Sequence, residues 1–162
     1  MGSYSARVIA KLPIVGEAKG PSISTSARVA ELCKDMESLA QEAFHLLTLN
    51  QKHKVIDRHL VALGSLTQSL VHPREVFRLA LLDCAAAVIF AHNHPSGDPA
   101  PSQDDRELTS RLEVAAEILG IRVLDHVIIG REGRFMSFCD EGLLRPKKQE
   151  GEGGVPWRSP CQ

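Results

Sequence analysis

Apolar residues occur in short blocks along the chain, and their spacing predicts a mixture of strands and helices. Runs typical of strands cover residues 43–49, 55–63, 85–91, 121–129 and 135–138. The first two are separated by residues 50–53, whose composition is typical of a hairpin turn. The run at 85–91 contains no polar residue, which is expected of a central strand covered on both faces.

Apolar residues three and four positions apart predict three helices between these strands. The first begins at one of the capping residues 24–26 and runs to Leu39, the second runs from Pro73 to about Cys84, and the third carries an apolar stripe from Leu108 to Leu119 closed by Gly120. Strands and helices therefore alternate irregularly. This order predicts an α/β or α+β fold with a mixed central β-sheet flanked by helices.

Length, composition and charge narrow the function classes. The 162 residues suffice for one domain, and 43 % hydrophobic with 24 % charged residues is typical of a soluble globular chain. A net charge of −1 gives no overall basic footprint, so a nucleic-acid partner is left open but not supported by charge. The longest apolar run is too short to cross a bilayer, and the N-terminus has no apolar signal core. We expect a cytoplasmic protein with no membrane partner.

Two histidines directly after the apolar run 85–91 are candidate metal ligands. His92 and His94 project to the same side of extended backbone, so both imidazoles can reach one ion. Pro95 favours this geometry because it biases the preceding residue toward extended conformations. Asp105, in the first turn of the following helix, could return a carboxylate to the pair. Two imidazoles and one carboxylate leave a fourth position for water, as in catalytic zinc sites.

Each part of this pattern has an ordinary alternative. Two histidines in a loop can simply be solvated, and Ser102-x-x-Asp105 matches a helix capping box that needs no metal. Capping and metal binding are compatible, because a capping serine can present its hydroxyl to the same cavity. The same donor set also describes a non-haem Fe(II) site.

The combination is more specific than its parts. The string HNHPSGDPAPSQDD at 92–105 resembles the JAMM/MPN metalloprotease motif H-x-H-P-x6-S-x2-D, and its H-N-H-P-S-G start resembles the RadC-like branch of that superfamily. The stretches VHPREVF at 71–77 and VLDHVIIG at 123–130 agree with that branch. The resemblance covers 23–144 and implies a cytidine-deaminase-like JAMM/MPN fold. It leaves 1–22 as an N-terminal extension with an edge strand at 6–12, and 145–162 as a tail whose composition predicts disorder.

The resemblance also implies roles for individual residues. The superfamily's metal ligands fall on His92, His94 and Asp105, which would hold Zn²⁺, and its oxyanion-stabilising serine falls on Ser102. The superfamily's glutamate precedes an apolar strand in a pattern like E-x-x-x-L-L and falls on Glu42. Glu42 would then accept a proton from the metal-activated water and deliver it to the leaving amine.

Two further assignments stay open at this stage. Asp57 and Glu75 are weaker candidates for the base, and Glu75, in the first turn of a helix, also suits the helix dipole. Asp125 or His126 could orient a ligand imidazole from a neighbouring strand, or could be an ordinary strand-end residue.

The predicted function is that of a zinc-dependent hydrolase, of the metallopeptidase or isopeptidase type, acting on a peptide or isopeptide substrate. The alternative is a non-catalytic metal-binding module with DNA or protein partners, since RadC-like proteins carry a historical association with DNA repair. Longer members have an N-terminal helix-hairpin-helix region that binds DNA, and from the roughly twenty residues before the shared region we expect no such element here. The sequence indicates no oligomeric state.

Overall fold

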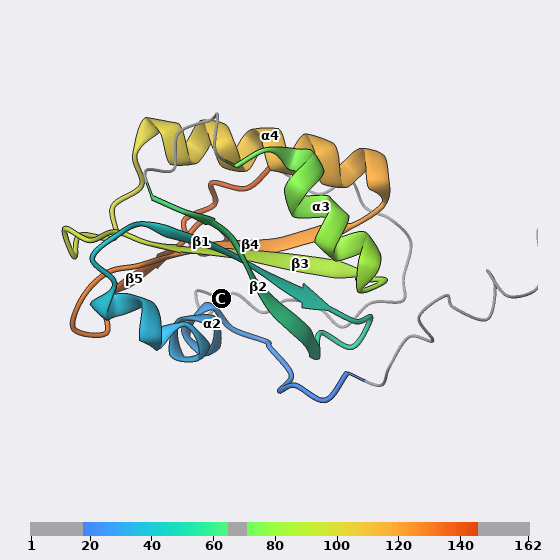
Figure 1. Cartoon of the computed structure of the whole chain (residues 1–162), viewed down its shortest axis with the longest axis horizontal. Helices are drawn as coiled ribbons and strands as arrows, with labels where there is room; N and C mark the ends of the chain where they lie inside the picture. Colours follow the sequence, from blue (N-terminus) through green and yellow to red (C-terminus); the bar gives the residue numbers. More distant parts are fainter. Residues whose placement is uncertain (1–17, 65–70, 146–162) are drawn as a thin grey trace, which may run out of the picture.

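A five-stranded mixed sheet forms the centre of the computed structural model, which describes residues 18–64 and 71–145 (Figure 1). The strands are β1 (Ala43–Leu49), β2 (Val55–Leu63), β3 (Ala87–Asn93), β4 (Arg122–Ile129) and β5 (Phe135–Ser137), in the spatial order β2-β1-β3-β4-β5. β1 is antiparallel to both β2 and β3, β3 is parallel to β4, and β5 is antiparallel to β4. The mixed sheet with β3 at its centre confirms the predicted fold class. The predicted strand at 6–12 and the tail from Pro146 lie outside the described residues.

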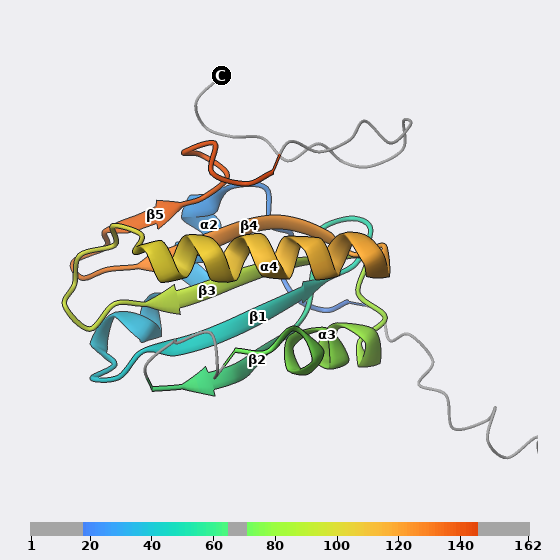
Figure 2. The same cartoon turned by 90° about the horizontal axis from the view of Figure 1, so that it is seen from above.

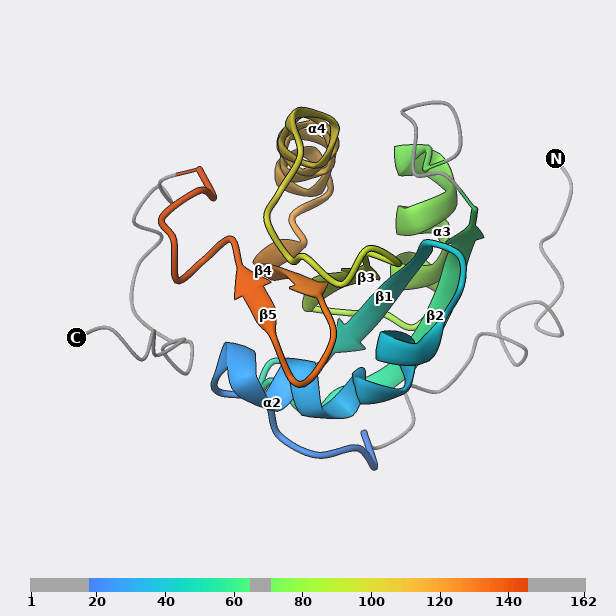
Figure 3. The ribbon, with the colours of Figure 1, turned by 90° about the vertical axis from the view of Figure 1, so that its left-hand side faces the viewer.

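Helices cover both faces of this sheet. α3 (Pro73–Leu82) and α4 (Gln103–Leu119) lie on one face, and α2 (Ser26–Leu32) with the short 3-10 helix η1 (Lys34–Ser38) lies on the other (Figures 1 and 3). Seen from above, α4 runs along β3 and β4, whereas α3 lies on the side of β2 (Figure 2). In the described part of the chain, no helix has the length and apolar character needed to span a membrane.

Alternation along β3 divides the core into two layers. Val88 and Phe90 pack toward α3 and α4, and Ala87 and Ile89 pack toward α2 and η1. Both sets are fully buried, as expected for a central strand. Because successive side chains point to opposite faces, the same alternation turns the next even-numbered residue, His92, toward α4.

The first helix is shorter than the sequence pattern predicts. α2 ends at Leu32, and the chain continues as η1 rather than as α-helix to Leu39. The Leu32 carbonyl accepts a hydrogen bond from Arg58 Nη1 at 3.0 Å, and the amide of Met36 bonds to the Cys33 carbonyl instead. A side chain from β2 therefore takes the place of the next helical hydrogen bond.

The second helix also ends early, at Leu82 instead of about Cys84. Leu81 is 54 % exposed, and Cys84 is exposed with φ 51°, beyond the helix. The buried face consists of Val76, Phe77 and Ala80. α4, by contrast, matches its prediction and ends at Leu119, followed by Gly120, whose left-handed φ of 67° suits a helix C-cap.

Candidate metal centre

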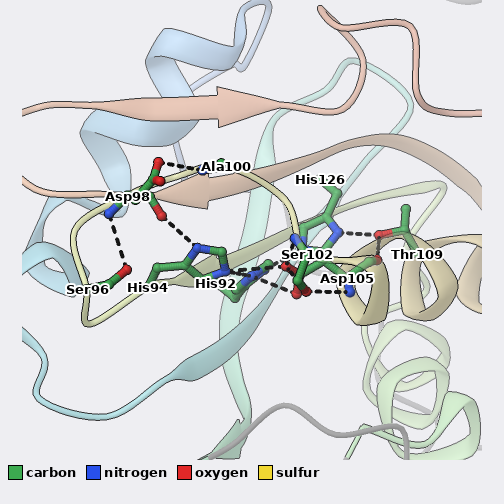
Figure 4. Close-up of polar contacts among 9 residues, drawn as sticks. All are labelled: His92, His94, Ser96, Asp98, Ala100, Ser102, Asp105, Thr109 and His126. Atoms are coloured by element: carbon green, nitrogen blue, oxygen red, sulfur yellow. Dashed lines mark hydrogen bonds and ion pairs between the residues drawn. The ribbon is translucent and has the colours of Figure 1, made fainter.

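The three predicted ligands lie together at the carboxyl end of β3 (Figure 4). His92 Nε2 is 3.0 Å from His94 Nε2 and 3.1 Å from Asp105 Oδ1, and His94 Nε2 is 3.4 Å from Asp105 Oδ2. The potential ligand atoms of the three residues all lie within 4.8 Å of one another. His92 and Asp105 are buried, and the His94 side chain is 14 % exposed, so the cluster meets solvent on the His94 side.

These separations fit a metal ion. Tetrahedral zinc binds nitrogen at about 2.0–2.1 Å and carboxylate oxygen at about 2.0–2.2 Å, which separates neighbouring ligand atoms by about 3.3–3.5 Å. The three separations of 3.0, 3.1 and 3.4 Å are close to that range. The donor set and its spacing are therefore compatible with a metal site.

Strand β3 both begins and ends two residues later than predicted, at Ala87–Asn93 instead of 85–91, so that His92 lies inside the strand rather than after it. The cause is Asn93, which points to the face opposite His92. Asn93 Oδ1 accepts a hydrogen bond from the Ala43 amide at 2.8 Å, and Asn93 Nδ2 donates to the Gln41 carbonyl at 3.1 Å. These bonds hold the end of β3 against the start of β1.

His94 is oriented by the loop that follows it. Its Nδ1 lies 2.7 Å from the carbonyl oxygen of Asp98, and because a carbonyl only accepts, Nδ1 carries the hydrogen. In the neutral ring, Nε2 then presents its lone pair to the cluster. The loop turns at Gly97, where φ is 84° and an added Cβ would lie 2.9 Å from the side chain of Arg131. The Gly97 carbonyl also accepts a hydrogen bond from the Arg131 amide at 3.2 Å.

Asp105 is held by the N-terminus of α4. Ser102 and Asp105 form a complete capping box, in which the Asp105 amide donates to Ser102 Oγ at 3.1 Å and the Ser102 amide donates to Asp105 Oδ2 at 2.8 Å. Ser102 Oγ also donates to Asp105 Oδ2, at 2.6 Å. The capping alternative is therefore present together with the cluster, and it leaves Oδ1 facing His92.

Of the two residues left open by the sequence, His126 contacts the cluster and Asp125 does not. His126 Nε2 lies 2.8 Å from His92 Nδ1, whereas the Asp125 carboxylate accepts hydrogen bonds from Ser137 Oγ and from the amides of His126 and Cys139. His126 rather than Asp125 faces the cluster because of a bulge in the pairing of β3 with β4. The pairing joins Val88 with Val123 but Ile89 with Asp125. One extra residue reverses the alternation and turns His126 toward α4.

Thr109 is a further residue of the site that sequence reasoning missed. Its Oγ1 lies 2.6 Å from His126 Nδ1 and donates to the Asp105 carbonyl at 2.6 Å (Figure 4). The sequence spacing could have indicated this residue, because Thr109 is four residues after Asp105 and therefore lies on the same face of α4.

The charges of the cluster shift several pKa values. The hydrogen bond with Asp105 raises the pKa of His94, and the nearby Glu42 charge adds to this effect. Burial alone would raise the pKa of Asp105, but its close polar contacts with the His92 and His94 imidazoles outweigh burial and hold that pKa well below its usual range. Burial lowers the pKa of His126 well below its ordinary value, and the charge of His92 acts in the same direction.

Glu42 lies just before β1, at the same end of the sheet as the cluster. The antiparallel pairing ends at Phe44 with His92, and continuing the same register by two residues would bring Glu42 opposite His94. The Glu42 charge acts on the pKa of His94, as expected of a neighbouring residue. Asp57 pairs with Thr48 near the other end of β1, and Glu75 is exposed beside Arg74 and Arg78. Neither alternative acid is near the cluster.

Comparison with known proteins agrees with this architecture. A mixed sheet between two helical layers, with a His-His-Asp cluster at the end of its central strand, defines a JAB/MPN-type domain. The model of the RadC-like JAB domain matches residues 23–143, and the chain belongs to this family.

Curated relatives match the same part of the chain. A UPF0758 protein of Symbiobacterium thermophilum is 54 % identical over 113 residues, which are 70 % of this chain and 48 % of the relative. A UPF0758 protein of Trichlorobacter lovleyi is 58 % identical over 104 residues, which are 64 % of this chain and 45 % of the relative. The matched region thus spans about half the length of these relatives.

Proposed function

We propose that the protein is a zinc-dependent hydrolase that cleaves an amide bond of a peptide or isopeptide. The observation that carries the proposal is the cluster of three donors, His92, His94 and Asp105, with Glu42 just before β1 at the same end of the sheet. The effect of the Glu42 charge on the pKa of His94 supports the closeness of Glu42 to this cluster. A carboxylate next to a three-donor metal cluster that leaves a fourth position for water is the arrangement that metal-assisted hydrolysis requires.

The three ligands would hold the metal with their unprotonated atoms. His92 and His94 supply Nε2 and Asp105 supplies a carboxylate oxygen. Bound zinc supplies Lewis acidity and lowers the pKa of a water molecule at its open position from about 15.7 to about 7. Iron(II) suits the same donor set, and the resemblance to the JAMM superfamily favours zinc.

Glu42 acts as the proton carrier in this proposal. Its carboxylate accepts the proton that the attacking water loses as the new C–O bond forms at the substrate carbonyl. It then delivers that proton to the amine nitrogen as the C–N bond breaks, so that one water is consumed and a carboxylic acid and an amine are released. Such a group typically contributes a factor of about 10²–10⁴ to the rate.

Ser102 stabilises the negative oxygen that develops on the substrate carbonyl. Its hydroxyl hydrogen is directed at Asp105 Oδ2, so it must rotate toward the substrate to do this. The backbone amide of Ser102 continues to hold the same Asp105 oxygen during that rotation, which keeps the ligand in place. Loss of one such donor costs about 3–4 kcal/mol in hydrolases.

The test compares metal content with turnover in protein purified without a histidine tag. Wild-type protein should contain zinc and cleave members of a broad peptide and isopeptide panel. Glu42→Gln should keep its zinc and lose about 10²–10⁴-fold of that activity. Glu75→Gln is a matched control, because Glu75 is an exposed acid paired with Arg74 and Arg78, and its activity should equal that of wild type.

Three results would overturn the proposal. Zinc-loaded wild type that cleaves nothing in the panel excludes the hydrolase and leaves a non-catalytic metal-binding module. Full activity in Glu42→Gln excludes the assigned base. Iron instead of zinc in the purified protein excludes zinc as the metal.

A further inference from the structure

We propose that Thr109 selects the nitrogen of His92 that carries the hydrogen, acting through His126, and thereby keeps His92 Nε2 available to the metal. Thr109 and His126 are then positioning residues of the metal site. This inference rests on the metal site of the proposed function, but it concerns metal binding and not turnover.

The inference starts from an unbroken chain of buried hydrogen bonds (Figure 4). Thr109 Oγ1 is 2.6 Å from the Asp105 carbonyl oxygen and 2.6 Å from His126 Nδ1, and His126 Nε2 is 2.8 Å from His92 Nδ1. These hydrogen bonds therefore connect the backbone of one proposed ligand, Asp105, with the ring of another, His92.

The hydroxyl hydrogen of Thr109 determines which atom donates in each hydrogen bond of this series. A hydroxyl has one hydrogen, and a carbonyl oxygen can only accept, so the Thr109 hydrogen must point at Asp105. The oxygen of Thr109 can then only accept from the other contact. His126 Nδ1 is therefore the donor in the bond of 2.6 Å between them.

The position of the hydrogen on the His126 ring in turn determines the position of the hydrogen on the His92 ring. The His126 ring is fully buried among the rings of Phe44, Phe90 and Phe138, an apolar environment that favours the neutral imidazole. A neutral imidazole that donates from Nδ1 accepts at Nε2, so His92 Nδ1 donates to His126. His92 Nε2 is then left with its lone pair directed at His94 and Asp105, which is the form a metal requires.

Removal of the Thr109 hydroxyl would release this constraint. In Thr109→Val, His126 Nδ1 has no hydrogen-bond acceptor, so nothing stabilises the tautomer with hydrogen on that nitrogen. With hydrogen on Nε2 instead, His126 faces His92 Nδ1 as a donor, and His92 must carry its own hydrogen on Nε2. That hydrogen occupies the ligand atom and competes with the metal. Loss of such outer partners lowers metal affinity about 10–100-fold.

The test measures zinc affinity by competition with a chromogenic chelator. Thr109→Val should bind zinc about 10–100-fold more weakly than wild type, and Thr109→Ser, which restores the hydroxyl, should recover the affinity. Thr48→Val is the matched control, because Thr48 is also a buried threonine whose hydroxyl is hydrogen-bonded, but to Asp83 and away from the cluster. It should lose stability and keep wild-type zinc affinity.

A second measurement reads the hydrogen positions directly. Nitrogen-15 chemical shifts of wild-type protein should show His126 protonated at Nδ1 and unprotonated at Nε2. Hydrogen on His126 Nε2 in wild type, or zinc affinity unchanged in a folded Thr109→Val variant, would overturn the proposal. Both readouts are independent of turnover, so a protein that binds zinc without cleaving any substrate fails the proposed function and leaves this inference intact.

Discussion

The side-chain oxygen of Asn93 accepts a hydrogen bond from the Ala43 amide at 2.8 Å, and Asn93 Nδ2 donates to the Gln41 carbonyl at 3.1 Å. Gln41 and Ala43 are the two neighbours of Glu42, and Asn93 lies between the proposed ligands His92 and His94. One amide side chain therefore fixes the backbone on both sides of the proposed base relative to the proposed ligands.

Replacement of this side chain should separate metal binding from turnover. In Asn93→Ala, the Ala43 amide and the Gln41 carbonyl lose their buried partner, which should cost about 1–3 kcal/mol of unfolding free energy. Turnover should fall because Glu42 is no longer held, whereas zinc content should stay near that of wild type. Urea unfolding, metal analysis and initial rates measure the three quantities.

Asn50→Ala is the control for this experiment. Asn50 also accepts backbone hydrogen bonds, from Lys52 and Lys54 in the turn between β1 and β2, but it lies at the opposite end of the sheet. It should lose stability and keep its rate per folded molecule. Equal rates for the two variants would contradict the assigned role of Asn93.

Removal of the metal should destabilise the fold. A ligand that binds only the native state at 100 times its Kd adds about 2.7 kcal/mol, and for a chain of this size each kcal/mol moves Tm by about 2–4 °C. A chelator should therefore lower Tm by about 5–10 °C, and added zinc should restore it. In His94→Ala this zinc-dependent shift should nearly disappear. A full shift in that variant would mean that zinc binds elsewhere.

Most of the fold and the clustering of the three candidate ligands could be predicted from local patterns. Strand limits at 43–49 and 55–63 were predicted as observed, because a polar turn bounds each apolar run. The clustering of His92, His94 and Asp105 was also predicted, since it depends on i, i+2 geometry in a strand and on the first turn of a helix. These features are set by neighbours close in sequence.

Features that depend on distant partners could not be predicted in the same way. The Arg58 side chain, from β2, bonds to the carbonyl that would continue α2, and Asn93 holds the last residues of β3 by bonding to the start of β1. The choice of His126 over Asp125 depends on a one-residue bulge in the pairing of β4 with β3, and simple alternation from Val123 would have turned Asp125 toward α4 instead.

Asp125 should make stability depend on pH. Burial raises the pKa of its carboxyl from 3.8 to about 7, against the hydrogen bond from Ser137 and those from the amides of Cys139 and His126. Because the native pKa lies above the unfolded one, its contribution to stability is complete below about pH 4 and is lost as pH rises toward 7. Asp125→Asn removes this ionisation.

The difference between wild type and Asp125→Asn isolates this one group. The unfolding free energy of wild type, relative to that of Asp125→Asn, should fall by about 2–3 kcal/mol between pH 5 and pH 8. Urea unfolding at several pH values, with chelator present throughout, measures this difference. A pH-independent difference would show that the Asp125 carboxyl has the same pKa in the folded and unfolded chain.

Gly97 should be required for the orientation of His94. Its φ of 84° strains any L side chain by about 1–2 kcal/mol, and an added Cβ would lie 2.9 Å from Cγ and Cδ of Arg131. Gly97→Ala should therefore displace the loop whose Asp98 carbonyl holds His94 Nδ1, and lower zinc affinity about 10-fold, as loss of a ligand's outer partner does.

Gly133→Ala is the control variant, because it shares the backbone strain, with φ 73°, but its Cβ would meet no atom within 4 Å. It should lose similar stability and keep its affinity. Equal zinc affinities in the two variants would show that the clash of the added Cβ with Arg131 does not displace the loop that orients His94.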